Sequence, residues 1–188
     1  MKNLLKFAFI ALFTAALATA CNSDDEDNPD DIWSRYERQR VVNEEFYNQQ
    51  KELKDADGKP FYQTVVPSWN ASAEILIHYF NDRAETAENL VPMWNSTCAV
   101  KYLGRLYNDV AFDSSYNEVN QLRNFQPSEV ITGWAIALMD MHVGDSARIV
   151  VPYPMGYGSS ITNASIPPYS TLVFDMKLQD ITAYEFLP

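Results

Sequence analysis

Short apolar runs of the kind that form β-strands, separated by turn signals, occupy most of the chain after residue 60. Only one stretch among them has a helical pattern, where Ser128 is a suitable cap for a short helix that runs to about Met139. The chain also holds ten Phe and eleven Tyr, which favour strands over a helical bundle. The strands are expected at residues 61–66, 74–80, 97–107, 147–151 and 171–178. This pattern predicts an α+β domain in which a sheet wraps over one short helix.

A longer helix is expected ahead of this domain, from Ile32 to about Leu53, because the segment is rich in Glu, Gln, Arg and Lys. Asp30 or Asp31 can cap its start, and the turn at residues 57–60 ends it. Its apolar residues fall roughly on one face: Ile32, Tyr36, Val42, Phe46 and Leu53. Such a face packs either on the following domain or on a second copy of the chain. We expect the first arrangement, because this helix is short for a stable dimer arm.

The first 20 residues have the pattern of a secretory signal peptide. Lys2 and Lys6 precede an apolar run from Phe7 to Leu17, and small residues follow it up to Cys21. This ending resembles a bacterial lipobox, so Cys21 is expected to become the lipidated mature N-terminus. Plain secretion, with Cys21 trimmed or free, is the alternative. The sequence thus predicts an exported protein with a lipid anchor at the bacterial outer membrane, either periplasmic or surface-exposed.

An acidic tract follows Cys21 and makes residues 21–31 a candidate tether. It resembles the acidic tracts that some bacterial lipoproteins carry for display on the outer face of the outer membrane, although a plain spacer explains it equally well. The whole chain carries a formal net charge of −11, which disfavours nucleic acid as a partner. The expected organisation is a signal peptide at 1–20, the tether at 21–31, a helical extension at 32–60 and one domain at 61–188.

The usual signatures of charged catalytic machinery do not occur in this sequence. There is no nucleophile elbow, P-loop or dinucleotide fingerprint. With two Cys and two His, neither a disulfide framework nor a usual zinc site is expected, and no metal or cofactor is predicted. The distinctive residues are aromatic, above all Trp134. Gly133 just before it would allow the helix to lie close to the sheet.

Seven short motifs, in order between Thr97 and Ile181, resemble those of FKBP-type peptidyl-prolyl cis–trans isomerases. The matching residues are Val100-Lys101-Tyr102-Leu103-Gly104, Phe112-Asp113-Ser114-Ser115, Val130 to Trp134, Met141 to Ala147, Tyr157-Gly158, Ile166-Pro167-Pro168 and Thr171 to Asp175. Each motif is weak alone, whereas the ordered set is specific. The resemblance implies an FKBP-like antiparallel half-barrel sheet wrapped over the Trp134 helix, with the long helix as an N-terminal extension.

The resemblance also implies an aromatic pocket that takes the ring of a substrate proline. Trp134 would form its floor, and the walls would be Tyr102, Phe112 and Phe174, with Val130, Ile131 and Ile166 lining it. Tyr157 and the backbone N–H of Ile131 would donate hydrogen bonds to substrate carbonyls, and Asp113 would stand at the rim. The implied partners are proline-containing polypeptides and macrolide immunosuppressants.

Two departures from the family pattern concern the grip on the substrate. The segment from Tyr116 to Asn124 is polar where the family usually has another large apolar wall, and Gln121 or Leu122 falls near that place. The loop at 159–165 also lacks the usual Gly and apolar residues. Without the family match, the aromatic residues would be read as ordinary core. Two functions therefore stay open: an isomerase of exported or unfolded proteins, and a non-catalytic module that binds peptides or a partner protein.

Overall fold

The computed structural model describes residues 32–161 and 165–184. The predicted signal peptide, Cys21, the acidic tether and the helix caps Asp30 and Asp31 lie outside the described residues. Within the described part of the chain, no helix has both the length and the apolar character needed to cross a membrane.

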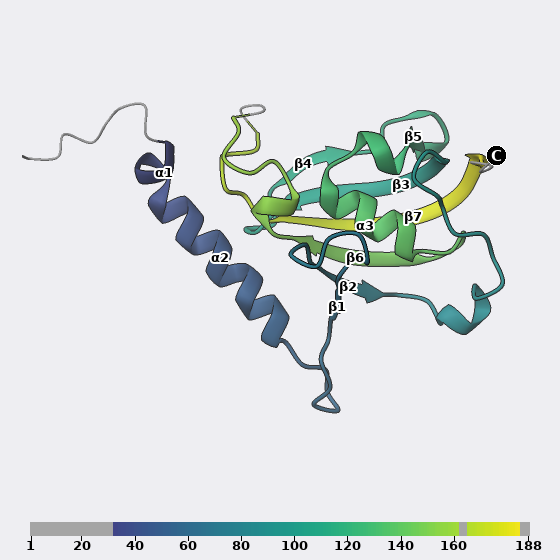
Figure 1. Ribbon diagram of the computed structural model, residues 1–188, viewed down its shortest axis with the longest axis horizontal. Coiled ribbons are helices and arrows are strands. Elements are labelled where there is room, and N and C mark those ends of the chain that lie inside the picture. Colours follow the sequence, from purple (N-terminus) through teal and green to yellow (C-terminus); the bar gives the residue numbers. More distant parts are fainter. Residues whose placement is uncertain (1–31, 162–164, 185–188) are drawn as a thin grey trace, which may run out of the picture.

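One antiparallel sheet forms the centre of the molecule (Figure 1). Its strand order is β1-β2-β6-β7-β3-β4, and β5 pairs with β3 beyond this path. The longest pairing joins β3 to β7, from Thr97 opposite Ala183 to Leu106 opposite Leu172. The strands are β1 (Gln63–Val65), β2 (Ile75–Tyr79), β3 (Thr97–Leu106), β4 (Ala111–Ser114), β5 (Arg123–Phe125), β6 (Ser146–Val151) and β7 (Leu172–Ala183).

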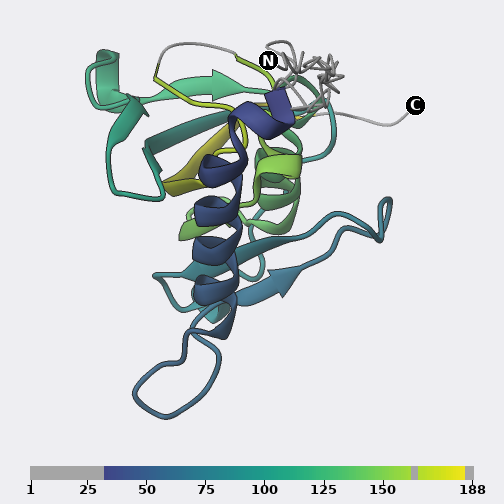
Figure 2. The ribbon, with the colours of Figure 1, turned by 90° about the vertical axis from the view of Figure 1, so that its left-hand side faces the viewer.

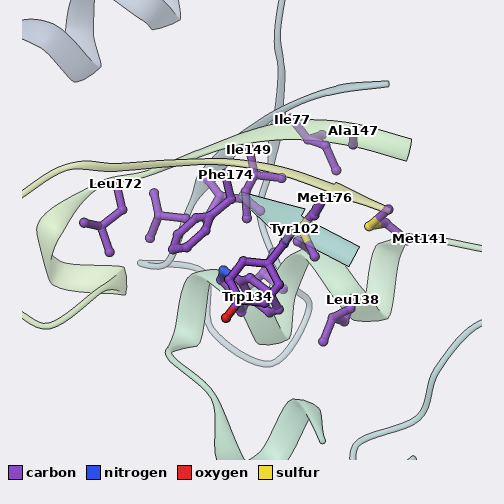
Figure 3. Close-up of a cluster of buried hydrophobic side chains, with 14 of the residues drawn as sticks. Ile77, Tyr102, Trp134, Leu138, Met141, Ala147, Ile149, Leu172, Phe174 and Met176 are labelled. Atoms are coloured by element: carbon purple, nitrogen blue, oxygen red, sulfur yellow. The ribbon is translucent and has the colours of Figure 1, made fainter. Parts of the chain in front are cut away.

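Helix α3 (Thr132–Asp140) packs on one face of this sheet and buries most of its length (Figure 3). A Cβ atom built on Gly133 would lie 2.4 Å from Cγ1 of Val151, so only glycine permits this approach of helix to sheet. The expected role of Gly133 is confirmed, but the predicted cap is wrong. Ser128 lies in a separate 3₁₀ turn, η3 (Pro127–Glu129), and α3 begins after Ile131 without a side-chain cap.

The N-terminal helix packs on the opposite face of the sheet, as expected for a helix that belongs to its own domain. Side chains alternate across a strand, so Val150 of β6 points away from α3 while Ile149 and Val151 point towards it. Val150 lies in a second cluster with Tyr47 of the helix. Both faces of the sheet are thus covered by a helix. This explains why the strand at 74–80 is apolar at almost every position. Figure 2 shows the helix running across the sheet.

This helix differs from the prediction in two ways. It is divided at Tyr36, where φ is −108° and ψ is 20°, into α1 (Ile32–Arg35) and α2 (Glu37–Glu52). Its buried side is centred on Asn43 and Tyr47, whereas Leu53, which was expected on the packed face, is 43% exposed. A polar side chain thus occupies the most buried position, because it makes hydrogen bonds across the interface that an apolar pattern does not indicate.

The remaining elements are short. Three 3₁₀ turns are η1 (Arg83–Glu85), η2 (Val119–Gln121) and η4 (Tyr153–Met155). Strands β4 and β5 were not predicted, since each is at most four residues long and half exposed. Strand β7 extends five residues beyond the expected end at Leu178, because its last part still pairs with the start of β3.

Candidate functional site

An aromatic cleft of about 260 Å³ opens at the N-terminal end of α3. Trp134, in the first turn of that helix, is only 4% exposed and lies beneath the sheet (Figure 3). The cleft is lined by Tyr102, Phe112, Asp113, Phe125, Glu129, Val130, Ile131, Trp134, Tyr157 and Phe174. These residues come from β3, β4, β5, β7, the segment from the end of η3 into the first turn of α3, and the β6–β7 connection.

The rings around Trp134 pack edge to face. The centroid of its ring lies 5.0 Å from that of Tyr102, 5.0 Å from that of Phe125 and 5.2 Å from that of Phe174. Phe112 in turn stands at 86° to Phe174. Such geometry is the preferred one for aromatic pairs. The walls therefore pack against one another in the absence of a ligand.

Gly104 of β3 provides the space for two of these rings. A Cβ atom at this position would lie 2.8 Å from ring atoms of both Phe112 and Phe174. Real side chains do not approach so closely, so a larger residue would push one wall into the cleft. The glycine at position 104, the last residue of the first motif, is thus explained by the rings of Phe112 and Phe174 that pack against it.

The rim carries a connected group of polar side chains. The hydroxyl of Tyr102 donates to Oδ2 of Asp113 at 2.6 Å, and Nη1 of Arg123 donates to the Tyr102 oxygen at 2.6 Å. Arg123 also lies 3.3 Å from both oxygens of Asp113. Burial, followed by the hydrogen bond to Asp113 and its charge, raises the pKa of Tyr102, so its hydroxyl stays protonated at neutral pH.

Two hydrogen-bond donors at the cleft have no protein acceptor among the described residues. One is the hydroxyl of Tyr157, which is 37% exposed. Burial and the nearby charge of Asp113 raise its pKa, so it also remains a donor. The other is the backbone N–H of Ile131, the residue just before α3. The carbonyl of Ile131 accepts from the backbone N–H groups of Trp134 and Ala135, whereas its own N–H is not used by any acceptor in the described part of the chain. Both donors can therefore bind acceptors of a ligand.

The structure brings eight of the nine sequence-predicted pocket residues to this cleft. They are Tyr102, Phe112, Asp113, Val130, Ile131, Trp134, Tyr157 and Phe174. Ile166 is not among the residues that line the cleft; it is 3% exposed and packs in the main core.

Sequence reasoning missed three residues of the site: Arg123, Phe125 and Glu129. Phe125 fills the place for which Gln121 or Leu122 was considered, and it comes from the unexpected strand β5. Arg123, Asn124 and Phe125 show no apolar alternation that could have indicated this short strand, because only the last of them is apolar. Among the described residues, no group of three or more His, Cys, Asp or Glu side chains could hold a metal ion.

Comparison with known proteins agrees with this geometry. A family model described as FKBP-type peptidyl-prolyl cis-trans isomerase matches residues 91–179. FK506-binding protein 1 of Saccharomyces cerevisiae is 36% identical over 88 residues, which cover 46% of this chain and 77% of the yeast protein. The chain belongs to the FKBP-type peptidyl-prolyl cis-trans isomerase family.

Other relatives extend beyond the matched part. The macrophage infectivity potentiator of Trypanosoma cruzi is 43% identical over 90 residues, which are 48% of this chain and 45% of that protein. The chain thus spans less than half of that relative's length. A peptidyl-prolyl cis-trans isomerase from Pseudomonas syringae pv. tomato has a solved structure with a TM-score of 0.62 and 25% identity, covering 78% of this chain and 95% of that chain. The expected FKBP-like fold is confirmed by this likeness.

Proposed function

We propose that this protein catalyses cis–trans isomerisation of Xaa-Pro peptide bonds in exported or unfolded polypeptides. The observation that carries the proposal is the cleft over Trp134, which combines apolar aromatic walls with two hydrogen-bond donors that have no acceptor among the described residues. A proline ring is compact and apolar, and it has no N–H that needs an acceptor. The flanking backbone carbonyls of the substrate would accept from Tyr157 and from the N–H of Ile131.

The chemistry requires no acid, base, nucleophile or metal. Amide resonance sets the barrier to rotation at about 18–20 kcal/mol. The twisted amide has less charge separation than the planar amide. A cleft that excludes water with aromatic walls therefore favours the twisted state over the ground state.

The polar residues would supply geometry rather than proton transfer. Donation from Tyr157 and Ile131 to carbonyls on either side of the rotating bond would hold the substrate in a twisted conformation. Asp113 stands at the rim in a position fixed by Tyr102 and Arg123.

An isomerase assay with a short Xaa-Pro peptide tests the proposal, with Phe112→Leu as the probe. Phe112 is only partly buried, so its replacement should reduce the rate much more than the stability. Ile149→Val is the matched control, because Ile149 is fully buried in the same core without lining the cleft. This control should cost about 0.5–1.5 kcal/mol of stability and leave the rate unchanged.

A folded wild-type protein that binds the peptide without accelerating isomerisation would contradict the enzyme and leave the peptide-binding module. Equal rates for wild type and Phe112→Leu would contradict the site. We also propose that macrolide immunosuppressants occupy the same cleft. Such a compound should inhibit the reaction competitively with the peptide.

We further propose that Cys21 carries a lipid that anchors the protein at the bacterial outer membrane. Support comes from the charged and apolar segments before Cys21 and from the acidic residues after it. A fatty-acid analogue should label the wild type and not Cys21→Ser. Recovery of unlabelled wild-type protein from the periplasm would contradict the anchor. Protease treatment of whole cells would then distinguish surface display from a periplasmic orientation.

A further inference from the structure

The segment that carries Tyr157 is joined at both ends to helix α2. We call residues 153–161 and 165–171 the flap; it connects β6 to β7 and reaches the cleft at Tyr157. In both ribbon views the flap, coloured yellow-green, lies beside the N-terminal half of α2 (Figures 1 and 2). Helix α2 belongs to the part of the chain before residue 91, where the family match begins.

The first junction is between Asn43 and Thr171, which are both buried. Oδ1 of Asn43 accepts from the backbone N–H of Thr171 at 2.7 Å, and the carbonyl of Asn43 accepts from the Thr171 hydroxyl at 3.0 Å. The amide nitrogen of Asn43 donates to the carbonyl of Gln39, one turn earlier in α2, at 2.7 Å. All polar groups of the Asn43 side chain are thus used, as a fully buried amide requires.

Two further contacts fix the flap to the same face of α2. The hydroxyl of Tyr153, at the flap's start, donates to Oε1 of Glu44 at 3.2 Å. Nε2 of Gln39 lies 3.4 Å from Oγ of Ser170, near its end. Three residues of α2 therefore bind residues from both ends of one flap.

Contacts inside the flap transmit this anchoring to Tyr157. The backbone N–H of Gly158 donates to the carbonyl of Tyr153 at 2.9 Å, and the N–H of Tyr169 donates to the carbonyl of Gly158 at 2.8 Å. The rings of Tyr153 and Tyr169 pack edge to face with their centroids 5.2 Å apart. Gly158, the residue next to Tyr157, is thus hydrogen-bonded to both anchored ends of the flap.

We propose that α2 is a positioning element of the cleft, and that Asn43 is its main positioning residue. This rests on the proposed isomerase function. The helix holds the flap so that the hydroxyl of Tyr157 already faces the cleft before substrate binds. Ordering a loop in advance removes an entropic cost that substrate binding would otherwise meet. The helical extension is then part of the catalytic unit and not a spacer between tether and domain.

The test compares Asn43→Ala with Tyr47→Phe in the full chain. The first removes the hydrogen bond from the Thr171 N–H to the Asn43 side chain and keeps the one to the backbone carbonyl of residue 43. The second removes a hydrogen bond from the same helix to Glu74, the residue before β2, and leaves the hydrogen bonds of the flap unchanged. We expect kcat/KM of Asn43→Ala to fall by about twofold to tenfold, the equivalent of one neutral hydrogen bond, and that of Tyr47→Phe to be unchanged.

Amide hydrogen exchange gives a readout that does not depend on catalysis. In Asn43→Ala the N–H groups of Gly158 and Tyr169 should exchange faster than in wild type after allowance for global stability, whereas in Tyr47→Phe they should not. If Asn43→Ala does not fold, Tyr153→Phe replaces it, because it removes only the hydrogen bond to Glu44. Unchanged exchange at both amides would overturn the proposal.

A double variant decides whether the effect passes through Tyr157. In a Tyr157→Phe background, Asn43→Ala should cause little further loss of kcat/KM, since the hydroxyl that it positions is already gone. An equal loss in both backgrounds would show that α2 acts elsewhere and would overturn the positioning role. A folded wild type without isomerase activity would contradict the proposed function instead, while the exchange rates would still decide whether α2 holds the flap.

Discussion

The hydroxyl of Tyr102 donates a 2.6 Å hydrogen bond to Asp113, across the rim of the cleft. The ring of the same residue lies against Trp134, with the two planes at 90°. Tyr102 therefore couples the apolar floor to the polar rim. A change at its hydroxyl should affect the position of Asp113 without emptying the core.

Tyr102→Phe tests this coupling. Loss of hydrogen bonds to charged partners should reduce the free energy of unfolding by about 1.5–3 kcal/mol. The rate should also fall, because Asp113 loses one of the groups that orient it. Tyr79→Phe is a close control: its hydroxyl donates to Asp140, also at 2.6 Å, but away from the cleft. Urea unfolding and isomerase assays on both variants should show similar losses of stability and a loss of kcat/KM only for Tyr102→Phe.

The residues of the cleft were largely predictable because they occur in short motifs with fixed order. Trp134, Tyr102 and Phe174 lie on elements whose existence follows from apolar patterning, and the motifs assign them to one pocket. Phe125 was not predicted as a cleft residue because β5 has three residues and only its last one is apolar. A strand that short is specified by its pairing with β3, which the local sequence does not encode.

The packing of α2 was harder to predict for a related reason. Its register on the sheet is set by Asn43, whose burial depends on Thr171, 128 positions away. A prediction from the apolar face of the helix expects Leu53 to be more buried than Asn43, because it does not include hydrogen bonds between distant segments. Ile166 shows the same limit: its motif predicts that it lines the cleft, whereas it is buried in the main core and is not among the lining residues.

Tyr157→Phe isolates the hydroxyl at the cleft. It keeps the ring and removes a donor with no partner among the described residues, so thermal stability should change little. The rate should fall by about twofold to tenfold if the hydroxyl holds a substrate carbonyl. Because burial and the charge of Asp113 raise the pKa of Tyr157 above its usual value, the wild-type rate should show no loss from ionisation of this group at neutral or mildly alkaline pH. Unchanged rates on peptides with different residues before proline would exclude the hydroxyl from the site.

Gly133→Ala tests the close approach of α3 to the sheet. The new methyl group would meet both methyl groups of Val151, at 2.4 and 2.8 Å, so helix or strand has to move. We expect a loss of about 1–3 kcal/mol, typical of overpacking. Combining it with Val151→Ala frees the space, so the double variant should be more stable than the sum of the single effects. If the changes in the free energy of unfolding, measured with urea, were strictly additive, the contact between residues 133 and 151 would be contradicted.

A buried carboxylate, Asp145, joins the loop after β2 to the turn between α3 and β6. It is fully buried and accepts from the Thr86 hydroxyl at 2.6 Å and from the backbone N–H of His142 at 2.8 Å. Asn81 donates to it as well, and Nε of Arg83 lies 3.3 Å away. Burial alone would raise the pKa of Asp145, but these hydrogen bonds and the charge of Arg83 outweigh it and lower the pKa.

This lowered pKa predicts how stability changes with acid. The unfolded carboxyl titrates near 3.8, above its folded value, so the stabilisation is present above that pH and is lost as the pH falls through the folded pKa. Asp145→Asn should reduce the free energy of unfolding at neutral pH by about 1.5–3 kcal/mol. It should also lose less stability than wild type between neutral pH and about pH 3. Asp57→Asn, at an exposed turn, should change neither quantity. Equal acid losses in wild type and Asp145→Asn, measured by urea unfolding, would show that this carboxylate does not govern the acid response.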